Sequence, residues 1–241
     1  MGRFAMYGKT DQGRRRRKNE DTIVVDEDRG FCLVADGIGG TAAGDIASQL
    51  FARAAETAFS GASYQEEIRY QLLQAVFLNA NEAIFSYAGS HPGCEGMGCT
   101  AEMLVLTDTR FILGHIGDSR TYRFRDGQFK LLTTDHTLVK QQLDQGLITR
   151  EEADHHSFKN VILRAVGIQK DPALDILRGH VYPGDMFVLC SDGLTDMMDD
   201  DMIKSHLFSE KGIREKVDGL IQEANDRGGK DNISVVLVQI L

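Results

Sequence analysis

Short runs of β-branched and other apolar residues recur along the chain and are separated by polar turns. Runs of strand length occupy residues 22–25, 31–35, 100–106, 111–116, 185–190 and 233–240. The dipeptide Asp126-Gly127 separates two further runs, at 121–124 and 129–132, which is a strong signal for a β-hairpin. Strands joined in this way predict sheets that are mostly antiparallel.

Apolar positions three and four residues apart predict three core-facing helices, at about 46–58, 68–84 and 213–224. Residues 135–179 are polar and helix-prone and show no strand pattern, so we expect them to form a mobile insertion that caps the sheet edge. No repeat or linker divides the chain. We therefore interpret residues 1–241 as one domain, in which paired helices cover the outer faces of the sheets.

Composition and charge exclude several classes of protein. With 42% hydrophobic and 26% charged residues, the chain has the composition of an ordinary soluble protein. Its net charge of −9 argues against a nucleic-acid partner, because duplex-binding proteins are usually basic. No apolar stretch approaches the roughly 20 residues that span a bilayer. The first six residues lack the apolar core of a signal peptide, and Met6 stands where a myristoylation signal has Ser or Thr. We expect a cytoplasmic monomer with no membrane partner.

Four aspartates stand at the ends of predicted core strands, where a surface charge is unusual. Asp36, Asp118 and Asp192 each follow an apolar run and have a glycine neighbour, and Asp231 precedes the last run. A single Asp-Gly pair is often only a turn. Four carboxylates that converged, however, would repel one another unless cations neutralised them. Oxygen ligands of this kind suit a hard ion such as Mg²⁺ or Mn²⁺.

A run of five basic residues, 14–18, stands just before the acidic pair Glu20-Asp21. In an acidic chain such a run is more often a solvated patch or a local phosphate-binding site than a nucleic-acid site. A guanidinium beside clustered metal ions suits phosphate-ester chemistry, because it holds phosphoryl oxygens through paired hydrogen bonds. We favour a local anion site at Arg16.

Five motifs follow one another along the chain: G-x-x-R-x-x-N-E-D at 13–21, V-A-D-G-I-G-G at 34–40, G-D-S-R at 117–120, S-D-G-L-T-D at 191–196 and D-N-I-S at 231–234. In order and spacing they resemble the motifs of the metal-dependent protein phosphatase 2C (PPM) family, and most of all its small stand-alone bacterial members. The resemblance runs from about residue 8 to the C-terminus. It implies an α+β fold, a central antiparallel β-sandwich flanked by paired α-helices on both faces, with residues 135–179 as a helical flap.

The resemblance also implies a role for each motif residue. Asp36 would bridge two metal ions, with Asp192 and Asp231 as further ligands of the first ion and the carbonyl of Gly37 as a ligand of the second. Asp118 and Asp192 would hold the third ion seen in bacterial relatives, and Asp196 would support it. Arg16 would bind the substrate phosphate, and Glu20 and Asp21 would order metal-bound waters.

The implied activity is hydrolysis of phosphoserine and phosphothreonine in proteins by a metal-activated water, with no phosphoenzyme and in opposition to a bacterial Ser/Thr kinase. The cofactors would be Mn²⁺ or Mg²⁺, two in the core site. The chain departs from eukaryotic relatives at Ile38, where they have a histidine, and from many bacterial relatives at Thr41. The general acid is therefore left open between a side chain and a metal-bound water.

Other classes of site fit the sequence less well. The G-x-G-x-x-A string at 37–42, with Glu56 further on, imitates a dinucleotide site but lacks the second strand of a βαβ unit. No G-x-S-x-G motif supports a serine hydrolase, and none of the four cysteines has an arginine six residues later, as cysteine phosphatases require. His155 and His156 are neighbours that would not face one another on a helix. A module that binds phosphorylated partners without catalysis remains the alternative of another class.

Overall fold

The computed structural model describes residues 4–38 and 43–241, except for the side chain of residue 154. Two five-stranded sheets form its centre, and every strand pair in them is antiparallel. In spatial order, the first sheet contains β1 (Phe4–Asp11), β12 (Ile233–Ile240), β11 (Met186–Cys190), β8 (Arg120–Arg125) and β9 (Gln128–Leu131). The second contains β10 (Asp175–His180), β7 (Arg110–Ile116), β6 (Ala101–Leu106), β3 (Phe31–Ala35) and β2 (Thr22–Asp26).

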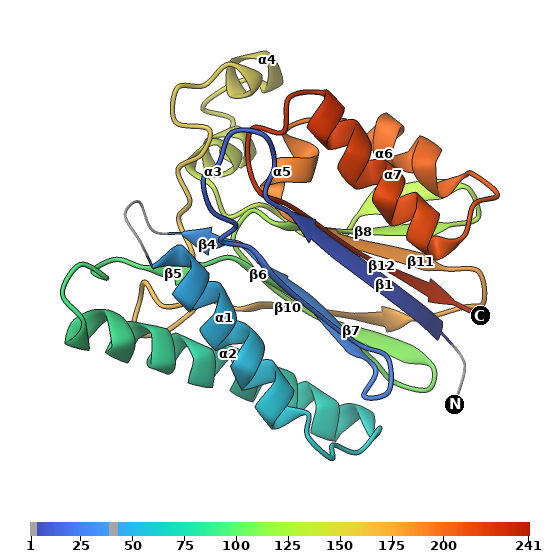
Figure 1. Ribbon diagram of the computed structural model, residues 1–241, viewed down its shortest axis with the longest axis horizontal. Coiled ribbons are helices and arrows are strands. Elements are labelled where there is room, and N and C mark those ends of the chain that lie inside the picture. Colours follow the sequence, from blue (N-terminus) through green and yellow to red (C-terminus); the bar gives the residue numbers. More distant parts are fainter. Residues whose placement is uncertain (1–3, 39–42) are drawn as a thin grey trace.

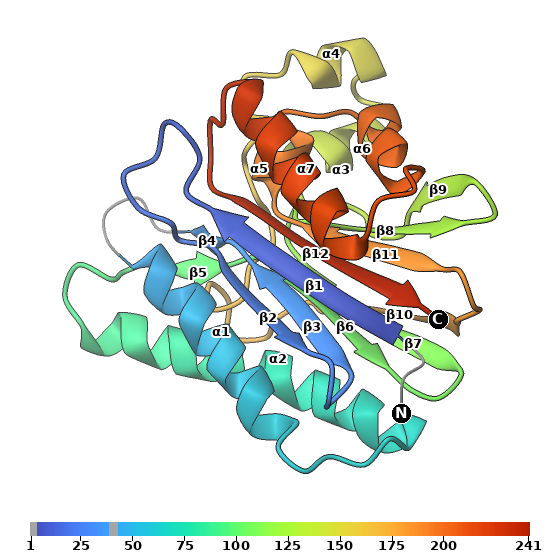
Figure 2. The same cartoon turned by 45° about the vertical axis from the view of Figure 1, so that its right-hand side comes forward.

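The two sheets pack face to face, with helices on both outer faces (Figures 1 and 2). The second sheet is covered by α1 (Gly44–Ala58) and α2 (Glu66–Ser90), and the first by α5 (Asp192–Thr195), α6 (Asp200–Leu207) and α7 (Ile213–Asp226). A short pair, β4 (Gly37–Ile38) and β5 (Gly98–Cys99), adjoins α1. The fold implied by the five motifs, an antiparallel sandwich between paired helices, is confirmed.

Alternation along the strands produces three apolar layers. Side chains of both sheets, among them Val34, Leu113 and Val236, fill the space between the sheets. The opposite faces of the same strands meet the helices: Leu33 and Met103 pack beneath α1 and α2, and Val235 and Leu237 beneath α7. Because successive side chains of a strand point to opposite faces, a strand buried on both faces appears as a continuous apolar run. The sequence pattern therefore identified these central strands.

Two strands at sheet edges were not predicted. β1 is half-buried along most of its length and pairs only with β12, so its sequence carries little apolar pattern. β10 begins inside the stretch 135–179, which we expected to contain no strand, and ends one residue beyond it; the strand pairs with β7 alone and carries Asp175, Arg178 and His180. The expectation was wrong there. An edge strand pairs with one neighbour only, so its sequence need not show the continuous apolar run of a central strand. The rest of the stretch contains two short helices, α3 (Leu138–Asp144) and α4 (Arg150–Asp154).

Three further findings bear on the sequence predictions. None of the helices in the described ranges has the length and apolar character needed to cross a bilayer. The four cysteines are free thiols, and three of them, Cys32, Cys99 and Cys190, are buried. Residues 1–3 and 39–42, which include part of the dinucleotide-like string and Thr41, lie outside the described residues.

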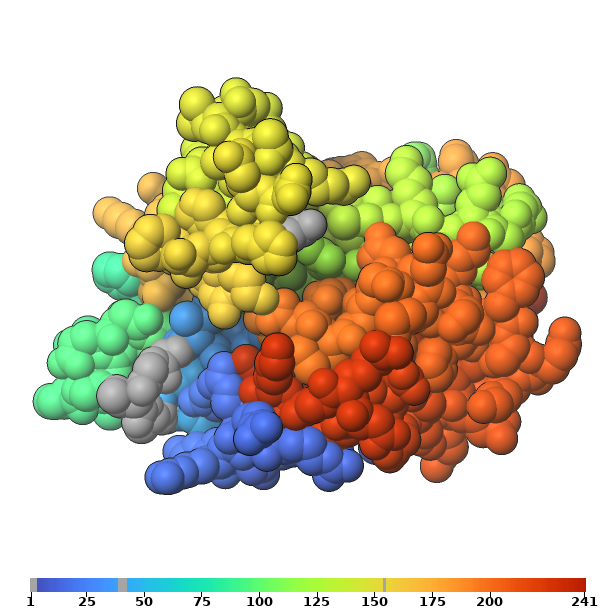
Figure 3. All heavy atoms as spheres, turned by 90° about the horizontal axis from the view of Figure 1, so that it is seen from above, coloured from blue at the N-terminus to red at the C-terminus, as the bar shows by residue number. Residues whose placement is uncertain are grey.

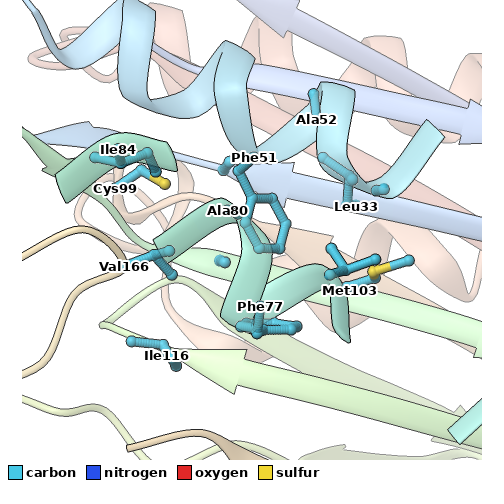
Figure 4. Packing of buried hydrophobic residues seen from close by; sticks show 14 of the residues in the cluster. Leu33, Phe51, Ala52, Phe77, Ala80, Ile84, Cys99, Met103, Ile116 and Val166 are labelled. Atoms are coloured by element: carbon cyan, nitrogen blue, oxygen red, sulfur yellow. The ribbon is translucent and has the colours of Figure 1, made fainter. Parts of the chain in front are cut away.

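The helix layer on the second sheet depends on Phe77 of α2, which is fully buried (Figure 4). Its ring meets Phe51 of α1 edge to face at 4.9 Å between centroids. A Cβ built on Gly114 of β7 would lie 2.6 Å from the Phe77 ring, so glycine at 114 allows this helix to approach the sheet.

Phe77→Ala should therefore lower the free energy of unfolding by about 3–5 kcal/mol, because it leaves a cavity among α1, α2 and β7. The adjacent Leu78 is 57% exposed, so Leu78→Ala is the matched control and should change stability by no more than about 0.5 kcal/mol. Chemical denaturation of both variants measures the difference. Equal losses in the two variants would contradict the packing role of Phe77.

Candidate functional site

Strand direction brings the four predicted aspartates to one edge of the sandwich. β3 and β7 both pair antiparallel with β6, so the two strands point the same way and end at the same edge. In the other sheet, the end of β11 lies beside the start of β12. Asp36 directly follows β3, Asp118 and Asp192 stand two residues after β7 and β11, and Asp231 stands two residues before β12.

The carboxylates are close enough to raise one another's pKa. Burial raises the pKa of Asp36 well above its usual value, and the charges of Asp21, Asp192, Asp118 and Asp231 raise it further. The pKa of Asp192 is raised in the same way, by burial first and then by Asp118 and Asp231. Protons or cations must therefore offset the negative charge gathered at this edge.

Oxygen atoms without partners support a cation site at this edge. Oδ1 of Asp192 and Oδ1 of Asp21 are buried and accept no hydrogen bond. A buried polar atom without a partner is costly, and carboxylate oxygens are the ligands that Mg²⁺ and Mn²⁺ prefer. Among the described residues, however, no three His, Cys, Asp or Glu side chains are arranged to hold an ion by themselves. Water and backbone carbonyls would have to complete the coordination, as is usual for Mg²⁺.

Two serines orient Asp21, and no sequence pattern indicated this role for either of them. The hydroxyls of Ser191 and Ser234 donate to Oδ2 of Asp21 at 2.8 and 2.6 Å. These bonds lower the pKa of Asp21, but burial has the larger effect and raises it to about 6. Asp21 thus presents its other oxygen, Oδ1, without a partner.

The basic loop at residues 14–18 is attached to this edge by Asn232. The side-chain amide of Asn232 donates to the carbonyls of Gln12 and Lys18 at 2.9 and 2.8 Å, and its oxygen accepts from the backbone N–H of Glu20 at 2.9 Å. The Arg16 guanidinium forms an ion pair with Asp231. Asn232 belongs to the last motif, but no sequence pattern indicated that it binds a loop more than two hundred residues away.

Two glycines let the backbone close around the carboxylates. A Cβ on Gly37 would lie 2.2 Å from the carbonyl oxygen of Gly44, and a Cβ on Gly193 would lie 1.9 Å from that of Asn232. Any larger residue would therefore push α1 away from β4, or α5 away from β12. Gly37 directly follows Asp36 in the chain, and its carbonyl oxygen would lie 2.8 Å from a Cβ built on Gly44.

The remaining predicted residues lie around the carboxylates. Glu20 is half-buried, and burial followed by the charge of Asp45 raises its pKa. Asp196 is exposed and pairs with Lys159 at 3.5 Å. Ile38 pairs with Gly98 in the short sheet and offers no titratable group. His155 is exposed, and no His cluster forms among the described residues.

Because β10 begins at residue 175, the flap is from here on the segment 135–174. A cavity of about 410 Å³ joins the carboxylates to this flap. Asp118, Asp192 and Asp196 line one wall, and Lys140, Arg150 and Lys159 of the flap line the other. Figure 3 shows the flap in yellow beside the orange and red surface of the C-terminal third, with the basic loop in blue across the same face.

The comparisons with known proteins agree with this geometry. A family model described as protein phosphatase 2C matches residues 12–237. The chain belongs to the protein phosphatase 2C family. It is 36% identical over 237 residues to the serine/threonine phosphatase stp of Listeria innocua, covering 96% of this chain and 94% of that one. The family membership predicted from the five motifs is thus confirmed.

Solved structures of the family share the fold throughout. The serine/threonine phosphatase of S. agalactiae superposes with a TM-score of 0.91 at 34% identity, covering 99% of this chain and 100% of that one. The catalytic domain of the serine/threonine phosphatase PstP, solved in complex with two manganese ions, gives a TM-score of 0.88 at 33% identity, covering 99% and 98%.

The shifted carboxyl groups predict how the stability of the metal-free chain varies with pH. Burial raises the pKa of Asp21 and of Asp118 from 3.8 to about 6, so the folded chain binds these protons more tightly than the unfolded chain. The free energy of unfolding should therefore fall as pH rises from about 4 to about 6. Chemical denaturation in a chelator, across this range, should show a smaller fall for Asp118→Asn. The exposed Asp28 supplies the control, since Asp28→Asn should match the wild type; an unchanged fall in Asp118→Asn would refute the assignment.

Proposed function

We propose that this chain hydrolyses phosphoserine and phosphothreonine in proteins with a metal-activated water and two core-site ions, Mn²⁺ or Mg²⁺. The observation that carries the proposal is the gathering of Asp36, Asp118, Asp192 and Asp231 at one edge, beside Arg16 and below a flap with cationic side chains. The names of its relatives, which are serine/threonine phosphatases, support the substrate class. The two manganese ions in the PstP complex support the cofactor.

The residues that would hold the ions are Asp36, the Gly37 carbonyl, Asp192 and Asp231, with Asp118 as ligand of a third ion. When bound, such ions lower the pKa of water and offset the charge that develops on a phosphoryl group. Burial first and then mutual repulsion raise the pKa of Asp36 and Asp192, and bound cations would offset the repulsion.

Three further side chains have roles that follow from their contacts. Arg16 is 49% exposed and reaches the edge from the basic loop, so its planar guanidinium can hold two phosphoryl oxygens. Asp21 is held by two serines with Oδ1 free, and can accept a hydrogen bond from a water. Glu20 is assigned the same role of ordering water. Because Ile38 carries no proton to donate, we assign protonation of the leaving oxygen to water.

The biological setting belongs to the same proposal. We propose a single phosphatase domain that acts in the cytoplasm as a monomer and opposes a Ser/Thr kinase. The net charge of −9 supports a protein partner rather than a nucleic acid. A phosphopartner-binding module without catalysis is the competing function, and the assay below separates the two.

The phosphatase should release phosphate from a phosphothreonine peptide in Mn²⁺ and should lose this activity in a chelator. Asp192→Ala should reduce kcat/KM by at least about 10³-fold, because it removes one of the carboxylates that would hold the core-site ions. Colorimetric phosphate release measures both effects, with Asp28→Ala as the control. A silent wild type that still binds Mn²⁺ and the phosphopeptide in calorimetry would favour the binding module instead.

Arg16→Ala should lower kcat/KM for the same peptide about 30-fold, through loss of a paired, charged hydrogen bond worth about 2 kcal/mol. Arg15 is exposed in the same basic loop and pairs with no described carboxylate, so Arg15→Ala is the matched control and should change the rate less than about threefold. Steady-state kinetics at fixed ionic strength measures kcat/KM of both variants. Equal losses in both variants would indicate a general effect of charge instead of a phosphate contact at Arg16.

A further inference from the structure

One buried residue, His136, contacts the core and both the outgoing and the returning segment of the flap. The side chain is 7% exposed. Its backbone N–H donates to the carbonyl of Gly117 at 2.7 Å where the flap begins. Its own carbonyl accepts from Leu163, at the other end of the flap, at 2.7 Å. The two stems of the flap therefore meet at His136, next to the turn that carries Asp118.

The imidazole ring of His136 connects the same two regions. The backbone N–H of Gly117 donates to Nδ1 at 3.1 Å, and Nε2 lies 3.1 Å from Oδ2 of Asp175, the first residue of β10. Since Nδ1 accepts a hydrogen bond it carries no proton, so the neutral ring holds its proton on Nε2 and donates it to Asp175. Arg164, which follows Leu163 in the returning stem, pairs with the other oxygen of Asp175 at 3.3 Å.

A second histidine fixes the plane of this ring. His115 of β7 lies 4.5 Å from His136 between centroids, and both of its nitrogens are occupied, by the buried Glu102 and by the carbonyl of Thr134. Burial, followed by the charge of His115, lowers the pKa of His136. The neutral ring that the Gly117 hydrogen bond requires is therefore also the favoured form.

Besides its packing against His115, the ring makes its polar contacts with two regions. Nδ1 holds the Gly117 N–H, whose residue adopts φ +115° and directly precedes Asp118. Nε2 lies within hydrogen-bond distance of Asp175 and, at 3.2 Å, of Nη1 of Arg164 in the flap, and Arg164 also pairs with Asp175. A cavity of about 540 Å³ beside His136, Arg164 and Asp175 leaves the flap stem room to move on this side.

We propose that His136 is a positioning residue that couples the flap to the Asp118 side of the metal site. Through Nδ1 it fixes the turn that orients Asp118. Through Nε2 it fixes the stem of the flap, and the flap and Asp118 line the same cavity of about 410 Å³. A movement of the flap that displaced the ring would then withdraw the acceptor from Gly117 and loosen Asp118. This coupling rests on the proposed function only in taking Asp118 as a metal ligand.

Two substitutions separate the two nitrogens. In His136→Asn, the amide oxygen can take the place of Nδ1 and accept from Gly117, but the shorter side chain does not reach Asp175. In His136→Gln, the amide nitrogen can take the place of Nε2 and donate to Asp175, while Gly117 loses its acceptor. His155 is an exposed histidine of the flap, so His155→Asn and His155→Gln are matched controls.

Calorimetric titration with Mn²⁺ alone measures ion binding at Asp118. The Asp118→Asn variant identifies which binding step depends on this residue. His136→Gln should weaken that step roughly 10- to 100-fold, as loss of a group that orients a ligand does, and His136→Asn less than about threefold. Limited trypsin digestion measures how readily the flap is cleaved after Arg150 and Lys159, which are both exposed. His136→Asn should be cut several times faster than the wild type, and His136→Gln at the wild-type rate.

Crossed effects of this kind would not arise from a histidine that only fills the core, because both substitutions would then disturb both readouts alike. Equal effects of Asn and Gln, or no effect of either while thermal unfolding shows folded protein, would overturn the coupling. If the wild type bound no Mn²⁺ at any step, the proposed function would fail together with the Asp118 half of the coupling. The digestion would then still decide the flap half, because it needs neither metal nor substrate.

Discussion

Repulsion among buried carboxylates is the constraint around which this molecule is organised. Asp36, Asp118 and Asp192 each stand at the end of a strand in a tightly packed sandwich, so they cannot move apart without disturbing the apolar layers behind them. Protein interiors of this density transmit strain instead of absorbing it. The core therefore holds together a set of charges that water would separate, and this arrangement favours a cation.

The same constraint explains which parts of the site the sequence could predict. A charged residue directly after an apolar run is conspicuous, and the antiparallel order of β3, β6 and β7 makes the ends of β3 and β7 coincide. The five motifs then gave the family and its fold. Both predictions followed from local sequence, because strands buried on two faces and Asp-Gly strand ends are visible in a few consecutive residues.

What the sequence did not predict depends on contacts between distant segments. β1 became recognisable only through its pairing with β12, and that pairing carries the basic loop to Asp231. Asn232 lies within a motif and His136 outside all five, but neither position indicated its partners, because each binds backbone groups elsewhere in the chain. Hydrogen bonds to a backbone leave no requirement on the partner's side chain, so they cannot be found by residue type.

The contacts of Asp231 connect cation binding with phosphate binding in the proposed chemistry. Its Oδ2 is paired with Arg16, and its Oδ1 accepts from the backbone N–H of Asn232 at 2.8 Å. Both oxygens are therefore engaged, and a cation that took Oδ2 would compete directly with the guanidinium. Arg16 would then lose its carboxylate partner while positive charge accumulates beside it. An arginine repelled by cations but attached through its loop to Asn232 has one favourable partner left, an anion bound over the same edge.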